Sequence, residues 1–244
     1  MKTNYHTHTK RCRHASGTDE EYVLAAIEGG FSTLGFSDHM PWFYTDDYIS
    51  DMRMGRGQVD DYFLSVECLR DKYAEKIEIK SGLECEYYPD SMDWLKFLKA
   101  VYEPDYLILG NHFLKNEQKG LYAGHAFTEK ELKLYLDTSI AAMQTKLYTC
   151  FAHPELFVYA CIAPSRYAIS IFRELAIAAR DLGVVFERNV QTPFHIELWE
   201  EVADVQPKVI IGIDAHKPKA LLTDAYEDNL LVMRSLGIEP ILTL

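Results

Sequence analysis

Seven short apolar runs alternate with longer amphipathic segments, and this alternation limits the possible folds more than any other feature of the sequence. The expected strands cover residues 3–8, 33–39, 77–87, 106–112, 149–154, 184–189 and 208–216. The expected helices cover residues 19–28, 59–74, 91–101, 129–146, 166–181 and 196–204. Such alternation predicts βαβ units with a parallel sheet, and either a doubly wound sheet or a closed barrel satisfies it.

The length of the chain, 244 residues, allows one large hydrophobic core. Barrels of the α/β class commonly form a single domain at this length, so we expect one domain over residues 1–244. Thr18, with Glu21 three residues later, gives the capping-box pattern that begins the first helix. Residues 40–58 and 113–128 look like long loops after strands, where α/β folds keep their binding and catalytic groups.

Possible metal ligands stand at the carboxyl end of every expected strand. They are His6 and His8, Asp38 and His39, Glu84 and Glu86, His112, His153, Glu187 and Asn189, and Asp214 and His216. An isolated histidine is more often structural than a ligand, but seven of the nine histidines lie at these ends or just after the first strand. His6 and His8 also share one face of an extended segment. The pattern therefore favours a metal site.

The charge balance excludes some classes of partner. The chain carries 37 acidic and 25 basic residues, a formal net charge of −12, and the basic residues are scattered rather than clustered. Long-range attraction to nucleic acid or to an anionic membrane is therefore disfavoured. A small-molecule substrate is expected, and the oligomeric state is left open.

The cysteines and the N-terminus indicate the compartment. Five cysteines without a C-x-x-C pair fit neither a disulfide framework nor a zinc ribbon, so a reducing environment is expected. Neither an apolar signal core nor a membrane-length apolar stretch occurs in the sequence. We therefore expect a cytoplasmic protein.

Six motifs, in this order and at these separations, resemble the PHP (polymerase and histidinol phosphatase) superfamily. They are HTHTKRCRH at 6–14, SDH at 37–39, GLECE at 82–86, NHF at 111–113, HPE at 153–155 and DAH at 214–216. Any one of these motifs is weak, but six in order are specific. The resemblance implies a distorted (β/α)7 barrel, similar to a TIM barrel, with three metal ions at its carboxyl-terminal mouth.

The resemblance also implies which residues bind each ion. The first ion would be held by His6, His8, Glu84 and Asp214; the second by Glu84, His112 and His153; the third by His14, His39 and His216. Glu84 would bridge the first two ions. Independently of the family, imidazole and carboxylate ligands suit Zn, Fe or Mn better than Ca or Mg.

This ligand set predicts hydrolysis of a phosphate monoester. Divalent ions lower the pKa of a bound water and neutralise phosphoryl oxygens. Glu84 is the central catalytic carboxylate in this prediction, and Asp214 or a water would protonate the leaving group. Asp38 is expected to orient an imidazole, in preference to transferring a proton. Candidate phosphate-binding residues are Arg13, Lys115, Arg166 and Lys217.

Within the superfamily, the opening motif and the length look most similar to bacterial histidinol phosphatases. This implies hydrolysis of L-histidinol phosphate to L-histidinol in histidine biosynthesis. The aromatic stretch 41–48 either walls an imidazole-bearing substrate or packs over the rim. Arg188, between Glu187 and Asn189, either points outward into solvent or marks a relocated phosphate ligand, and strand alternation favours the outward position. Cys12 and Cys85 are expected to be small buried hydrophobic residues.

Three alternatives remain open. A PHP phosphoesterase could act on another small phosphate ester. A barrel amidohydrolase also uses H-x-H on its first strand, although it needs no cluster like His14, His39 and His216. A metal-stabilised scaffold without activity is disfavoured, because structural metal sites are normally closed by ligands from local loops.

Overall fold

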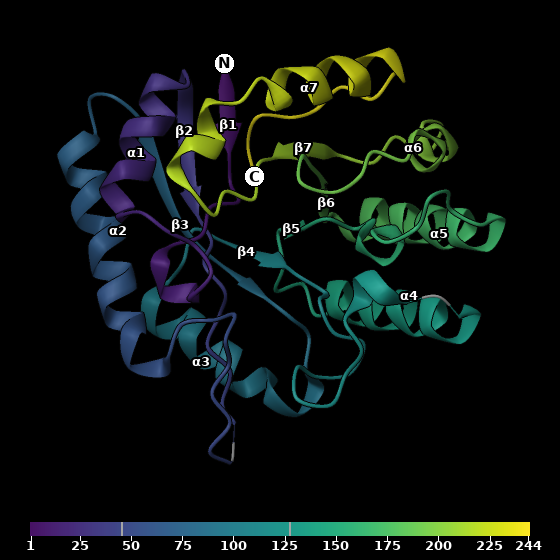
Figure 1. Ribbon diagram of the computed structural model, residues 1–244, viewed down its shortest axis with the longest axis horizontal. Helices are drawn as coiled ribbons and strands as arrows, with labels where there is room; N and C mark the ends of the chain where they lie inside the picture. Colours follow the sequence, from purple (N-terminus) through teal and green to yellow (C-terminus); the bar gives the residue numbers. More distant parts are fainter. Residues whose placement is uncertain (45, 127) are drawn as a thin grey trace. The chain divides into compact units, whose positions relative to one another are not determined.

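The computed structural model describes residues 1–44, 46–126 and 128–244 (Figure 1). Its seven strands follow one another in the sheet in sequence order. They are β1 (Lys2–Asn4), β2 (Phe31–Phe36), β3 (Glu78–Cys85), β4 (Tyr106–Leu109), β5 (Cys150–Phe151), β6 (Val185–Asn189) and β7 (Val209–Gly212). The α-helices are α1 (Asp19–Glu28), α2 (Val59–Tyr73), α3 (Met92–Tyr102), α4 (Glu129–Gln144), α5 (Arg166–Leu182), α6 (Ile196–Val202) and α7 (Ala225–Ser235).

The chain divides into two compact units, and each is assembled from separate segments of the sequence. The first unit contains Met1–Cys85, Pro89–Leu107 and Gly212–Asp224. The second unit contains Glu86–Tyr88, Ile108–Ile211 and Ala225–Leu244. The single domain expected over residues 1–244 stays a prediction.

In the first unit, β2 pairs in parallel with β1 and with β3. Helix α1 begins at Thr18, whose side chain accepts the Glu21 N–H while the Glu21 carboxylate accepts the Thr18 N–H. The predicted capping box is therefore confirmed. The pairing aligns the ends of the strands, and the segments that follow them begin at one edge of the sheet.

The side chain of Tyr106 fixes the packing of this sheet. Its hydroxyl donates to the backbone oxygens of Tyr5, at 2.6 Å, and Phe36, at 3.0 Å. A Cβ atom at Gly82 would lie 2.6 Å from Tyr106 Cζ, and one at Gly35 would lie 2.3 Å from its hydroxyl. Both positions therefore require glycine because the tyrosine ring lies directly against the strands.

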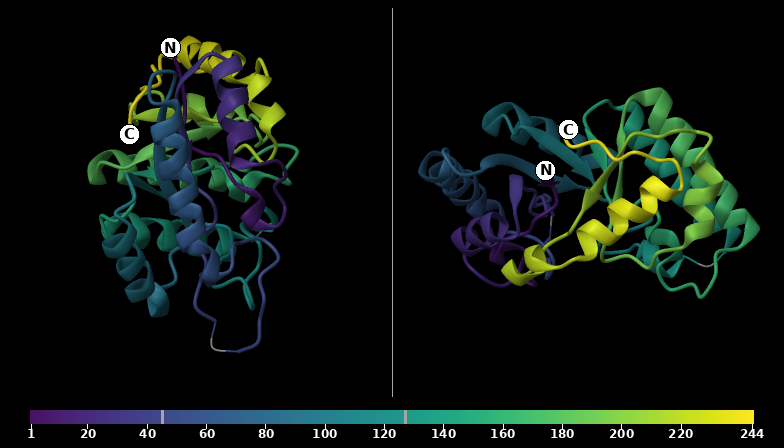
Figure 2. Two further views of the ribbon diagram at one scale, coloured as in Figure 1. Left: turned by 90° about the vertical axis from the view of Figure 1, so that its left-hand side faces the viewer. Right: turned by 90° about the horizontal axis from the view of Figure 1, so that it is seen from above.

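In the second unit, β5 pairs in parallel with β4 and with β6. Helix α5 packs beside α4 and α6, as the teal and green helices in Figures 1 and 2 show. Ser165 caps the start of α5, and Gly183, at φ 76°, ends it in the left-handed conformation that favours glycine.

The sequence-based boundaries of the helices agree with the structure to within two residues, but the expected strands were too long. Most of the motif residues lie one to four positions beyond a strand end, in extended segments that the apolar pattern does not distinguish from strands. Helix α7 had no counterpart among the expected elements. In the described part of the chain, none of the helices has the length and apolar character needed to cross a bilayer.

Candidate metal centre

Four buried donor atoms of the first unit converge on one point. The Nε2 atoms of His6 and His8 lie 3.0 Å apart. Asp214 Oδ1 lies 3.4 Å and 3.1 Å from these two nitrogens, and Glu84 Oε2 lies 3.4 Å and 3.5 Å from them. Both histidines are 0% exposed and Glu84 is 1% exposed. Lone pairs gathered this closely in a water-poor site fit a bound cation.

Backbone pairing at the ends of β1 and β7 produces this convergence. The His8 N–H donates to the Ala215 oxygen at 3.0 Å, and the Ala215 N–H donates to the His6 oxygen at 3.1 Å. Asn4 joins the two segments further, because its side-chain oxygen accepts the Ile213 N–H at 2.8 Å. Two chain segments far apart in sequence are thereby held in register, and the motifs that they carry face each other.

Asp38 lies behind His8. Its Oδ1 is 3.4 Å from His8 Nδ1 and accepts the His39 N–H at 2.8 Å, while its Oδ2 accepts the Thr9 hydroxyl. Asp38 was expected to orient an imidazole, and the imidazole that it contacts here is that of His8. Because this carboxylate lies beside Nδ1, Nε2 is the ring nitrogen that faces the donor group, and it would bind a cation there after losing its proton.

The charges in the cluster shift its pKa values strongly. Although burial acts against it, hydrogen bonds to Asp214 and Asp38 raise the pKa of His8 well above its ordinary value. Although burial would raise it, the charges of His6 and His8 hold the pKa of Asp214 well below its ordinary value. Asp214 is therefore a carboxylate at neutral pH.

His14, His39 and His216 lie around this group. Ring centroids of His14 and His216 are 4.5 Å apart, those of His14 and His39 are 5.3 Å apart, and His39 Nδ1 lies 3.0 Å from Glu84 Oε2. Burial and the nearby charge of His8 lower the pKa of His216 to about 4, so its ring is neutral at pH 7. The first unit thus brings together seven of the nine predicted ligands.

The other two predicted ligands, His112 and His153, pair within the second unit. Their ring centroids lie 5.0 Å apart, and both side chains are buried. His112 Nδ1 lies 2.9 Å from Glu86 Oε1. The His153 N–H donates to Glu187 Oε2 at 3.0 Å. Glu86 therefore contacts the Nδ1 side of His112 in the way that Asp38 contacts the Nδ1 side of His8.

The sequence model of the PHP domain family matches residues 4–191, which is more than half of the chain. The chain belongs to the PHP domain family. It is 32% identical over 237 residues to the "Probable histidinol-phosphatase" of Deinococcus radiodurans, covering 87% of this chain and 85% of that protein. It is 30% identical over 138 residues to the histidinol-phosphatase of Bacillus subtilis, covering 53% and 52% of the two chains.

A solved structure confirms the predicted class of fold. The crystal structure of histidinol phosphate phosphatase from Lactococcus lactis, complexed with zinc, L-histidinol and phosphate, has a TM-score of 0.78 and 18% identity. The match covers 98% of this chain and 95% of that chain. The fold is therefore the α/β, (β/α)7 fold that the PHP motifs implied.

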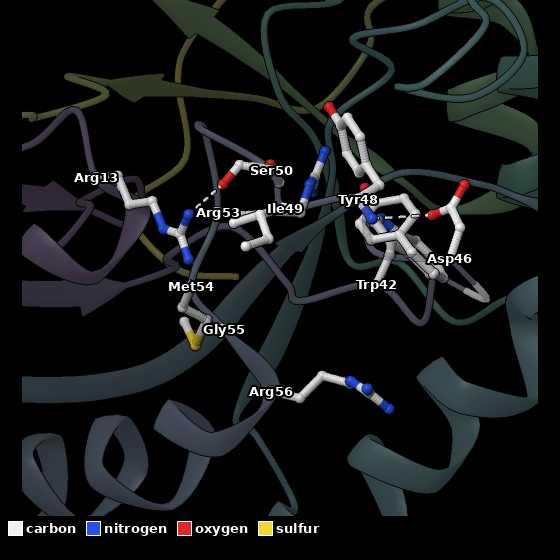
Figure 3. A pocket seen from close by; sticks show the side chains of 11 residues that line it. Arg13, Trp42, Asp46, Tyr48, Ile49, Ser50, Arg53, Met54, Gly55 and Arg56 are labelled. Atoms are coloured by element: carbon white, nitrogen blue, oxygen red, sulfur yellow. Dashed lines mark hydrogen bonds between the residues drawn. The ribbon is translucent and has the colours of Figure 1, made fainter.

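One candidate phosphate ligand, Arg13, lines a cavity in this PHP domain. It ends the turn Lys10–Cys12 with a left-handed φ of 72°, and its guanidinium donates to the Ser50 oxygen at 2.7 Å. The cavity has a volume of about 220 Å³ and also takes in Trp42 and Arg56 (Figure 3). Arg13 directly precedes the predicted metal ligand His14 in the sequence, but His14 is not among the described residues that line the cavity.

The other three candidates are exposed and belong to separate segments of the chain. Lys217 directly follows His216 and precedes the short 3-10 helix Pro218–Leu222. Lys115 lies in the 113–128 loop, and Arg166 is the first residue of α5. Their role in phosphate binding stays a prediction.

The expectation that Arg188 points into solvent is wrong. Its side chain is almost fully buried, and its guanidinium donates to Glu155, Thr192 and Asn229 at 2.6–3.0 Å. Alternation along β6 does turn Arg188 away from Glu187 and Asn189, but Asn229 comes from α7. That helix was not among the expected elements, so strand alternation alone could not predict this contact.

Cys12 lies among the candidate ligands, a position that the sequence pattern did not assign to it. It is fully buried, as expected, but its thiol lies among site histidines rather than in the apolar core. Burial alone would raise the pKa of the Cys12 thiol, but hydrogen bonds with His14 and His8 lower it. The C-x-H spacing at 12–14 is the only signal in the sequence that could have indicated this.

Proposed function

We propose that this PHP domain is a metal-dependent phosphatase that hydrolyses L-histidinol phosphate to L-histidinol and phosphate, a reaction of histidine biosynthesis. The convergence of His6, His8, Glu84 and Asp214 is the observation that carries the proposal. Relatives named as histidinol-phosphatases, and a similar fold complexed with zinc, L-histidinol and phosphate, support the choice of substrate. The proposal includes a cytoplasmic location without nucleic-acid or membrane partners.

Three divalent transition metal ions, Zn, Fe or Mn, belong to the proposal. His6, His8, Glu84 and Asp214 would hold one ion, and His14, His39 and His216 another. His112 and His153 would hold the remaining ion, and the sharing of Glu84 with it rests on the family resemblance alone. When bound, such ions activate a water at neutral pH and neutralise phosphoryl oxygens.

The protein itself would fix the protonation states of the candidate ligands and the directions in which their donor atoms point. Asp38 and Glu86 hold the Nδ1 sides of His8 and His112, which leaves the Nε2 lone pairs directed into the site. Because its pKa lies well below normal, Asp214 offers negative charge rather than a proton at neutral pH. A water, rather than this carboxyl group, would then protonate the departing alkoxide.

A specific observation favours a second candidate, an ester that carries another acidic group. Three arginines, Arg13, Arg53 and Arg56, and one carboxylate, Asp46, line the described part of the cavity in Figure 3. An anionic group suits this charge balance better than the ammonium group of histidinol does. The cavity therefore gives a reason to test esters that contain a carboxylate.

The test compares phosphate release from three esters by the metal-loaded protein: L-histidinol phosphate, O-phosphoserine and O-phosphoethanolamine. The last two differ by one carboxylate. We expect L-histidinol phosphate to have the highest kcat/KM. If the kcat/KM of O-phosphoserine is ten times that of both other esters, the proposed substrate is wrong and the proposed phosphatase reaction stands. A tenfold difference corresponds to about 1.4 kcal/mol of transition-state binding. Hydrolysis of none of the three would contradict the proposal.

A further inference from the structure

The turn after β1 places Cys12 beside two histidines. Thr9 caps the turn Lys10–Cys12 by accepting the Arg11 N–H, and the left-handed Arg13 then reverses the chain. As a result, one ligand atom from each of Cys12, His14 and His216 lies within 4.8 Å of the other two. The sulfur is fully buried, so this proximity is part of the folded interior.

Both histidines of this cluster present an acceptor nitrogen. His14 Nδ1 lies 2.8 Å from the Cys12 backbone oxygen, and His216 Nδ1 lies 3.1 Å from the Asp214 backbone oxygen. A carbonyl oxygen only accepts, so each Nδ1 carries the hydrogen and each Nε2 keeps its lone pair. His216 Nε2 is buried and makes no hydrogen bond to any described residue.

His39 is less well placed than Cys12 to complete this pair. Its Nδ1 lies 3.0 Å from Glu84 Oε2, which directs the ring toward the four-donor group. Its ring centroid is 6.3 Å from that of His216, against 4.5 Å between His14 and His216. A His39 ligand atom does lie within 4.8 Å of one from His216, in a group with His8, whereas the Cys12 sulfur forms such a group with His14 and His216 together.

We propose that Cys12 is a metal ligand, whose thiolate binds a zinc-class divalent ion together with His14 and His216. The inference rests on the proposed metal-dependent function and adds a sulfur donor to a site for which the motifs indicate only histidines. When the sulfur–metal bond forms, the thiol releases its proton to solvent. A thiolate favours Zn, Co or Fe at this position over Mn or Mg.

A competing role for Cys12 is that of a hydrogen-bond donor only. The sulfur also lies within 4.8 Å of ligand atoms of His8 and Asp38. However, the carboxylate of Asp38 already accepts the Thr9 hydroxyl and the His39 N–H and faces His8 Nδ1. The experiment must therefore detect a sulfur–metal bond directly.

The test loads the chelator-treated protein with Co²⁺ and records its absorption spectrum. Every sample carries Cys68→Ser, because this exposed thiol could bind cobalt adventitiously. We expect a thiolate-to-cobalt charge-transfer band in the near ultraviolet, lost completely in Cys12→Ser. Cys85→Ala is the matched control: Cys85 is equally buried and follows Glu84, but strand alternation points it to the opposite face, so the band should persist.

X-ray absorption of the zinc-loaded protein gives a second readout. It should show a sulfur neighbour at about 2.3 Å, replaced by nitrogen or oxygen in Cys12→Ser. A cobalt- or zinc-loaded protein without any sulfur signal overturns the inference, and this result needs no variant to fold. If that protein still hydrolyses L-histidinol phosphate, the proposed function stands. If the protein neither takes up metal nor hydrolyses the ester, both the proposed function and the assignment of Cys12 as a ligand fail.

Discussion

At the scale of single residues, strand alternation predicted to which side of the strand a side chain points, but not which residues surround that side chain. It correctly separated Arg188 from Glu187 and Asn189, whose side chains hydrogen-bond to each other at 3.0 Å. What covers Arg188 depends on α7, more than thirty residues further along the chain, and local sequence carries no information about that contact. The same limit applies to Cys12, whose neighbour His216 comes from the far end of the chain.

Arg188→Met should destabilise the protein by about 3–5 kcal/mol, because it leaves Glu155 as a buried carboxylate without its cation. Urea denaturation measures the effect. The double variant Arg188→Met/Glu155→Met should recover much of the loss, since an apolar pair of similar size removes both charges. Arg180→Gln, at an exposed ion pair, should change stability by less than about 1 kcal/mol. Equal effects of Arg188→Met and Arg180→Gln would contradict this account.

The stability of the metal-free protein should fall between about pH 6.5 and pH 4 because of His216. Burial and the His8 charge lower the pKa of His216 from 6.5 to about 4. The unfolded chain therefore binds a proton in this window while the native chain does not, which costs up to about 3 kcal/mol. His216→Gln should flatten the curve measured by urea denaturation with chelator present, and His125→Gln, at an exposed histidine, should not. Parallel curves for wild type and His216→Gln would rule the explanation out.

At the scale of elements, helices were more predictable than strands. Capping residues mark helix ends locally, as Thr18 and Glu21 do for α1, and long amphipathic periods are hard to mistake. A strand ends where its neighbour ends, and that depends on pairing partners elsewhere in the chain. The role of Gly82 could not be predicted for a similar reason, because the ring of Tyr106 that requires it comes from another strand.

Gly82→Ala should destabilise the protein by about 1–3 kcal/mol. The new Cβ would lie 2.6 Å from Tyr106 Cζ, and the ring cannot move without losing its hydrogen bonds to the backbone oxygens of Tyr5 and Phe36. Gly57→Ala is the matched control, since a Cβ there has open space, and it should stay within about 0.5 kcal/mol of wild type. Thermal unfolding of both variants measures the difference, and a neutral Gly82→Ala would show that the sheet adapts.

At the scale of the whole molecule, the α/β class and the candidate ligands followed from one regularity, whereas the (β/α)7 barrel was implied by the resemblance of the motifs to the PHP superfamily. Parallel strands that alternate with helices place their carboxyl ends at one edge, so polar residues recurring at those ends belong to a site. This reasoning selected the seven candidate ligands that the first unit brings together and the histidine pair of the second. It could not show which atoms meet, because the 3.0–3.5 Å separations within the cluster depend on packing of the complete unit.

Metal binding should stabilise the native protein measurably, and Glu84 should be essential to that effect. Its Oε2 lies within 3.5 Å of His6 Nε2, His8 Nε2 and His39 Nδ1, so Glu84→Gln removes a negative charge that lies close to three imidazoles. Zinc at 100 times its dissociation constant should add about 2.7 kcal/mol to the free energy of unfolding. A 100-fold weaker site in Glu84→Gln would reduce this gain to about 0.4 kcal/mol.

The measurement is urea denaturation with zinc and with chelator, together with phosphate release from L-histidinol phosphate by the zinc-loaded samples. Glu78→Gln serves as the control, because Glu78 lies at the opposite end of β3, half exposed and paired with Lys80. It should keep both the zinc-dependent stabilisation and the activity, whereas Glu84→Gln should lose both. If Glu84→Gln keeps the full gain from zinc, Glu84 is not a ligand. If it loses only activity, Glu84 acts on the substrate rather than on the metal.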